Sequence, residues 1–155
     1  MPHSRRQFLT SGSAVTLLTL MAASGLLGRQ AAAAQWNKGA FESKSIDELV
    51  RTLGGTAPQL TDDIEFVGPE IAENGAVVPV EITSRIPGTD SIALLIEKNP
   101  NLLAASFTIP AGTLPEIQTR VKMAETCDVY ALVRAQGKFY YTAKQIKVTV
   151  GGCGG

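Results

Sequence analysis

The 155-residue sequence contains one histidine, His3, which lies near the start of the chain. Histidine is the most frequent general base, the usual partner of a nucleophilic serine or cysteine, and the commonest metal ligand. Two cysteines without a nearby histidine also cannot form an ordinary zinc site. We therefore expect a protein that has no catalytic residues of its own, binds no cofactor and holds no metal.

Aromatic residues and long basic runs are also scarce. Only 6% of the residues are aromatic but 45% are hydrophobic, so a packed core must consist mainly of valine, isoleucine, leucine and alanine. Basic and acidic residues balance at 14 each, and no segment concentrates the basic ones. Nucleic-acid and anionic-membrane binders normally carry such a basic cluster, so we expect neither activity.

The first 34 residues have the composition of an export signal. Arg5 and Arg6 stand in the segment Ser4–Leu9, which matches the twin-arginine signature. A weakly apolar stretch over residues 14–27 is too short and too polar to span a membrane, and four alanines at 31–34 suit a signal peptidase. We predict a twin-arginine signal peptide over residues 1–34, a periplasmic mature protein and no membrane insertion.

Residues 35–150 are predicted to form one domain that begins with a loose lead-in over residues 35–40 and a short helix. Ser45 and Glu48 have the spacing of a capping box, in which the side chain of each residue accepts a hydrogen bond from the backbone N–H of the other. Apolar residues then recur at helical spacing, at Ile46, Leu49, Val50 and Leu53. The pair of glycines at 54–55 is expected to end the helix.

The rest of the domain shows short apolar or alternating segments separated by turn residues about every ten positions. Pro79 interrupts one of these strands and cannot donate a backbone hydrogen bond, so we expect that strand at a sheet edge or beside a bulge. Gln136-Gly137 is predicted to form a two-residue hairpin turn. About seven strands predict an all-β immunoglobulin-like sandwich, with a small barrel as the alternative. The predicted strands lie at residues 63–67, 78–82, 91–97, 103–109, 117–126, 129–135 and 139–150.

The chain ends in Gly151-Gly152-Cys153-Gly154-Gly155, here called the carrier arm. Glycine samples backbone angles of both signs and adds no side-chain bulk, so this sequence predicts a thin, flexible arm that can enter a narrow pocket. A reactive thiol needs a helix N-terminus, a fixed cation or a metal to stabilise its thiolate, and the arm has none of these. We predict that Cys153 carries a covalent group and is activated by partner enzymes.

Cys127 is the second thiol, and its role is open at this stage. A free cysteine is among the most frequently buried residue types, which favours a small apolar core residue. A disulfide with Cys153, as a redox partner, is the first alternative because a flexible arm could satisfy disulfide geometry. An intermolecular disulfide is the second alternative.

The tail and several internal segments resemble SoxY, the sulfur-carrier family of bacterial thiosulfate oxidation. The resemblance rests on the carrier arm preceded by Val148-Thr149-Val150 and on residues 69–75, 97–100, 106–107 and 120–126. It implies an immunoglobulin-like fold, a heterodimer with SoxZ, and a sulfur substrate bound covalently to Cys153. It also implies serial partners: a c-type cytochrome, SoxAX, that joins thiosulfate to the thiol, a hydrolase, SoxB, that releases sulfate, and a sulfane dehydrogenase, SoxCD.

Three other functions compete with a sulfur carrier. A thiol–disulfide redox protein using Cys127 and Cys153 would lack the Cys-X-X-Cys spacing that tunes such sites. A carrier that loads sulfur as a thiocarboxylate on Gly155 would need ATP-driven adenylation, and ATP is scarce in the compartment to which an exported chain is sent. A purely structural subunit would leave the arm without a role.

Overall fold

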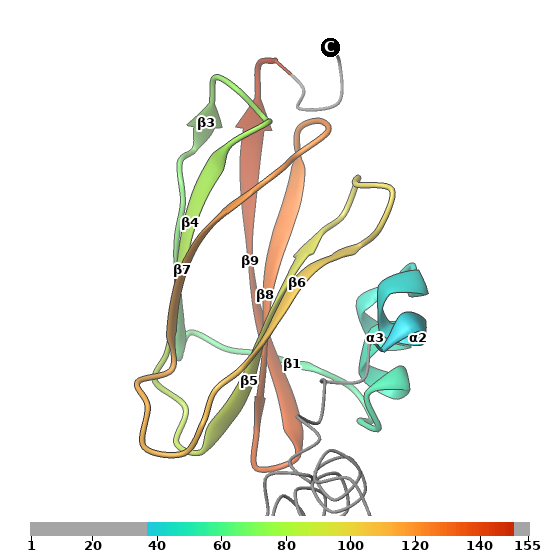
Figure 1. The fold of residues 1–155 in the computed structure, drawn as a ribbon, viewed down its shortest axis with the longest axis vertical. Helices are drawn as coiled ribbons and strands as arrows, with labels where there is room; N and C mark the ends of the chain where they lie inside the picture. Colours follow the sequence, from blue (N-terminus) through green and yellow to red (C-terminus); the bar gives the residue numbers. More distant parts are fainter. Residues whose placement is uncertain (1–36, 151–155) are drawn as a thin grey trace, which may run out of the picture. The chain divides into compact units, whose positions relative to one another are not determined.

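The computed structural model describes residues 37–150, which form an immunoglobulin-like β-sandwich with two short helices on one face (Figure 1). The larger sheet has the strand order β1-β9-β8-β5-β6, and β3 pairs separately with β9. The smaller sheet has the order β2-β4-β7. The helices are α2 (Lys38–Glu42) and α3 (Ile46–Thr52), and the strands are β1 (Gln59–Leu60), β2 (Ile64–Val67), β3 (Ile71–Ala72), β4 (Val78–Ser84), β5 (Thr89–Ile96), β6 (Leu103–Thr108), β7 (Glu116–Val121), β8 (Cys127–Ala135) and β9 (Lys138–Val148).

The main core lies between the two sheets and follows from the alternation of side chains along each strand. In β4, Val78, Val80 and Ile82 are buried against the larger sheet, and Pro79 is exposed on the opposite face. Ile92, Leu94 and Ile96 of β5 and Val129, Ala131 and Val133 of β8 meet them from the other side. The predicted sandwich is therefore confirmed, with two additional strands, β1 and β3, that are only two residues long.

The helices form a third layer on the outer face of the larger sheet. Leu95 of β5 and Leu132 of β8 point away from the main core and pack with Leu49 and Val50 of α3. This second cluster explains why residues 91–97 read as one continuous apolar run, since β5 is buried on both faces. A strand that is covered on both sides has no polar face to alternate with.

The bounds of two predicted segments need correction. The lead-in over residues 35–40 was expected to be a loop, but Lys38–Glu42 form α2, which the Asn37 side chain caps by accepting from the Ala40 N–H at 3.1 Å. The single strand expected over residues 117–126 stops at Val121, and a loop follows before β8 begins at Cys127.

The strand that contains Pro79 is the central strand of the smaller sheet, so the predicted edge position is wrong. The physical reason is that β2 pairs with β4 only as far as Val67 opposite Glu81. Beyond that point β4 is paired on one side alone, where Pro79 lies opposite Arg120 of β7. Pro79 therefore lies in a part of the central strand that has a free edge. Proline is tolerated there because it has no backbone N–H to donate to a neighbouring strand.

The hairpin between β8 and β9 matches its prediction. Gln136 has φ of 51° and Gly137 has φ of 74°, the positive pair required by the tight turns that suit twisted antiparallel strands. The turn joins the two longest strands of the fold, which stay paired from Ala135 opposite Lys138 to Cys127 opposite Ile146. It thereby fixes the register that brings the last residues of β9 to one end of the sandwich (Figure 1).

Candidate functional site

The predicted attachment residue, Cys153, and the arm glycines Gly151, Gly152, Gly154 and Gly155 lie outside the described residues, as does the signal peptide predicted over residues 1–34. The structure describes the chain up to Val150, the residue directly before the arm. The site can therefore be built from the end of β9 and the segments that hold it. We call residues 147–150 the arm root.

One side of the arm root is fastened by β3 and the turn that follows it. β3 runs parallel to β9, with Ala72 opposite Val148. The Thr149 N–H donates to the Ala72 carbonyl at 3.1 Å, and the Thr149 hydroxyl donates to the Glu73 carbonyl at 2.9 Å. The Gly75 N–H donates to the Val150 carbonyl at 2.8 Å. The backbone is thus held through the last residue before the arm.

The other side of the arm root is held by one side chain, Thr126. The regular pairing of β8 with β9 ends at Cys127 opposite Ile146, so Val148 has no ladder partner on this side. The Thr126 hydroxyl replaces that partner because it accepts from the Val148 N–H at 2.9 Å and lies 3.4 Å from the Val148 carbonyl. A buried or half-buried N–H without a partner would cost about 1–3 kcal/mol.

A second set of bonds ties the loops beneath the root to one another. The Gly75 carbonyl accepts from the Met123 N–H at 2.7 Å, and the Met123 side chain is fully buried. The Asn99 side chain accepts from the Ala124 N–H at 3.0 Å and donates to the Lys122 carbonyl at 2.7 Å. The loops around residues 75, 99 and 123 therefore form one hydrogen-bonded support for the arm root.

Three of the sequence segments that resemble SoxY meet in this support. Residues 69–75 contact the root directly, residues 120–126 supply Thr126 and Met123, and residues 97–100 supply Asn99. The sequence analysis named these segments but did not foresee that they surround the arm root. The usable signal was the presence of Asn99, Thr126 and Thr149, residues that commonly bond backbone groups, beside strand ends.

Cys127 is buried with 4% of its surface exposed, and it packs in the core between the sheets. The expectation of a small apolar core residue is confirmed. Burial raises the pKa of the Cys127 thiol above its ordinary value, and the nearby Glu97 carboxylate acts in the same direction. Because the thiolate is the reactive form, both effects make Cys127 a poor nucleophile.

We expect an alkylating reagent to distinguish the two thiols in the folded protein. Cys127 should react about a hundredfold or more slowly than a freely accessible thiol, since reaction requires a local opening of the core. Mass spectrometry of peptides after timed labelling with iodoacetamide at pH 8 measures both rates. In urea the two rates should converge, and equal rates in the folded protein would contradict the buried position of Cys127.

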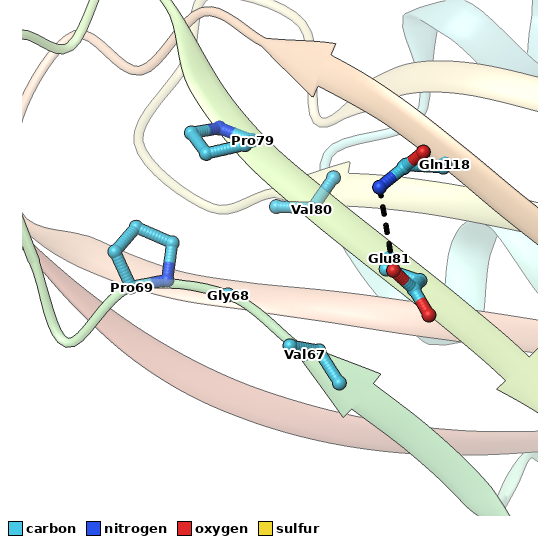
Figure 2. A pocket seen from close by; sticks show the side chains of 7 residues that line it. All are labelled: Val67, Gly68, Pro69, Pro79, Val80, Glu81 and Gln118. Carbon is cyan, nitrogen blue, oxygen red and sulfur yellow. Dashed lines mark hydrogen bonds between the residues drawn. The ribbon is translucent and has the colours of Figure 1, made fainter.

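An open groove lies on the smaller sheet, where β2 ends beside the unpaired part of β4 (Figure 2). Apolar side chains line most of it, and the Gln118 amide lies 3.4 Å from the Glu81 carboxylate at its margin.

Within residues 37–150, no group of three or more His, Cys, Asp or Glu side chains could hold a metal ion. No helix in the same range is long and apolar enough to cross a membrane.

The fold and the site define a class of protein. It is an immunoglobulin-like sandwich whose last strand is held by hydrogen bonds as far as the residue before a thiol-bearing peptide. The family described as "Sulfur oxidation protein SoxY" matches residues 50–153. The chain belongs to the SoxY family and is a sulfur carrier of sulfur oxidation. Membership of this family implies partners from the Sox system, such as SoxZ.

Solved structures that are similar to this chain include a SoxY protein and a reeler domain. The sulfur carrier protein SoxY from Chlorobium limicola f thiosulfatophilum is 36% identical, with a TM-score of 0.62, over 70% of this chain and 99% of that one. The human F-spondin reeler domain is 15% identical, with a TM-score of 0.38, over 61% of this chain and 95% of that one. No curated protein sequence matches the chain.

Proposed function

We propose that the chain carries sulfur intermediates of thiosulfate oxidation on the Cys153 thiol of the carrier arm. The observation that carries the proposal is the family match, which extends to residue 153 and so includes the cysteine. A second support is the arm root, whose hydrogen bonds continue through Val150 and leave the thiol three residues beyond a fixed point.

The proposed reaction sequence begins with two steps on the thiol. In the first, Cys153 and thiosulfate lose two electrons and one proton and form a sulfur–sulfur bond, which gives a cysteine S-thiosulfonate. In the second, water attacks the sulfonate sulfur, so that sulfate and a proton leave and a cysteine persulfide remains. The electrons of the first step pass to a c-type cytochrome partner.

The chain itself is proposed to be the substrate of these reactions and not their catalyst. The only histidine lies within the predicted signal peptide, so the mature domain supplies no imidazole to activate the thiol. The reacting groups are then provided by partners: SoxAX for thiosulfate joining, SoxB for sulfate release and SoxCD for oxidation of the remaining sulfur. SoxZ is proposed as the stable heterodimer partner, and the periplasm, reached by twin-arginine export, as the compartment.

A thiol–disulfide redox role for Cys127 and Cys153 is less well supported. Cys127 is 4% exposed and lies between the sheets, and burial raises the pKa of its thiol. Disulfide exchange requires an accessible thiolate, which this position does not offer.

The test is the mass of the intact chain after reaction with thiosulfate, SoxAX and an electron acceptor. We expect an adduct of the size of a thiosulfonate on the wild-type protein and on Cys127→Ala, and no adduct on Cys153→Ser. Subsequent addition of SoxB should hydrolyse the adduct, so that sulfate is released and a persulfide remains on the chain. An adduct that survives in Cys153→Ser, or no adduct on the wild-type chain, would refute the proposal.

A further inference from the structure

Exposed apolar side chains surround the arm root. Ile71, Val77 and Val150 are 56%, 55% and 60% exposed, and they belong to the segments whose backbones bond one another at the root. Ile71 precedes Ala72, which accepts from Thr149, and Val77 lies two residues after Gly75, which donates to Val150. We call Ile71, Val77 and Val150 the root ring.

The fold gives no reason for these positions to be apolar. The neighbours of two ring residues, Ala72 and Val78, are buried in the core between the sheets. Successive side chains of a strand point to opposite faces, so Ile71 of β3 is directed away from that core. Val77, in the bend directly before β4, is exposed as well. Exposed apolar residues that gather at one place on a polar surface are typical of a contact with another protein.

The short distance from Val150 to Cys153 indicates that the partner of the root ring is an enzyme that acts on the thiol. Cys153 follows Val150 by three residues, and three extended residues span at most about 11 Å. An enzyme that encloses the Cys153 thiol must therefore bring the entrance of its pocket within that distance of Val150. The surface around the entrance then meets the end of the sandwich where the root ring lies.

The arm root also presents the ring in a fixed arrangement. Backbone bonds from Gly75 and Thr149 and the side chain of Thr126 hold the three segments before any partner arrives. A preorganised contact surface avoids the entropy cost of ordering loops on association. Charges of both signs border the ring on the β3 side, since Glu70 and Glu73 are exposed there and the exposed Lys147 lies opposite Ile71.

We propose that the root ring is the docking surface for the enzymes that act on Cys153, and that it packs against an apolar rim around the entrance to their active sites. The inference rests on the proposed carrier function and adds its recognition surface. The ring positions the arm in the entrance, while the arm alone carries the reacting thiol. Docking then contributes binding energy that the glycine arm, which lacks side chains, cannot supply.

The test compares two double variants in the complete carrier. Ile71→Ser with Val77→Ser replaces two of the three ring side chains, and Leu60→Ser with Leu114→Ser replaces two apolar side chains elsewhere that are 69% and 81% exposed. Leu60 pairs with Tyr141 of β9, nine residues before Val150, which places it about 30 Å away along the strand. We expect kcat/KM for SoxAX-catalysed thiosulfonate formation to fall about tenfold in the ring variant and to stay unchanged in the control.

Two further measurements separate docking from other causes. Alkylation of Cys153 by iodoacetamide and the thermal midpoint should be the same in both variants and the wild type. A ring variant that reacts with SoxAX as fast as the wild type, or a control that loses as much, overturns the docking ring while the carrier function stands. A wild-type chain that gains no adduct on Cys153 overturns both.

Discussion

Replacing Leu95 by alanine should lower the free energy of unfolding by about 2–5 kcal/mol, although Leu95 lies on the outer face of the larger sheet. In a two-layer sandwich that face would meet solvent, and the same substitution would cost little. Leu95 is fully buried here because it packs with Leu49 and Val50 of α3. The loss combines the hydrophobic transfer energy of the deleted methyl groups with the cavity left between sheet and helix.

Two matched variants make the Leu95 prediction specific to the third layer. Leu94→Ala removes the adjacent side chain, which is also fully buried but faces the main core, and should cost a similar amount. Leu60→Ala, in β1 of the same sheet, removes a side chain that is 69% exposed and should cost less than about 0.5 kcal/mol. Urea unfolding of the three variants gives the comparison. A Leu95 loss as small as that of Leu60 would show that the helices do not cover the sheet in solution.

The elements whose signals lie within a few residues could be predicted from the sequence. The capping box of α3 forms, since the Ser45 hydroxyl accepts from the Glu48 N–H at 3.2 Å. The Glu48 carboxylate reaches back as expected, although it accepts from Lys44, one residue before the cap, at 2.8 Å. The hairpin could be predicted because Gln136-Gly137 stands between two apolar runs, and both of its residues have positive φ.

Elements that depend on distant contacts could not be predicted in the same way. The five residues of α2 are too few to show helical periodicity, and the helix is stabilised by its Asn37 cap and by burial of Ala40 against the sheet. The two-residue strand β3 likewise has no pattern of its own. Its position follows from parallel pairing with β9, in which Thr149 bonds Glu73, 76 residues earlier.

The same division applies to the candidate site. Cys153 and its glycines could be singled out from composition, because a free thiol near the end of a chain that is predicted to be exported is uncommon. The support of the arm root could not, because it joins loops around residues 75, 99 and 123 through single backbone or side-chain bonds. The resemblance to SoxY marked these segments without assigning them a purpose, and their common purpose becomes visible only in the fold.

Thr126→Val should loosen the arm root and slow the reaction of Cys153 with partner enzymes. The substitution keeps the shape of the side chain but leaves the Val148 N–H without its partner at 2.9 Å. Such a loss is worth about 1–3 kcal/mol, so local opening and amide exchange at Val148 should increase about fivefold to a hundredfold. Hydrogen exchange followed by mass spectrometry or NMR measures this change directly.

A loosened root lengthens the segment that carries the thiol. If β9 separates as far as Ile146, the free segment that ends at Cys153 grows from residues 151–153 to residues 147–153. The concentration of a tethered group at a fixed point falls roughly as the −3/2 power of tether length, so thiol delivery should fall about threefold to fourfold whenever the root is open. Thr126→Ser keeps the hydroxyl and should behave like the wild type in both measurements. Faster exchange at Val148 with unchanged SoxAX kinetics would mean that the fixed root does not limit delivery of the thiol, and unchanged exchange would mean that Thr126 does not hold it.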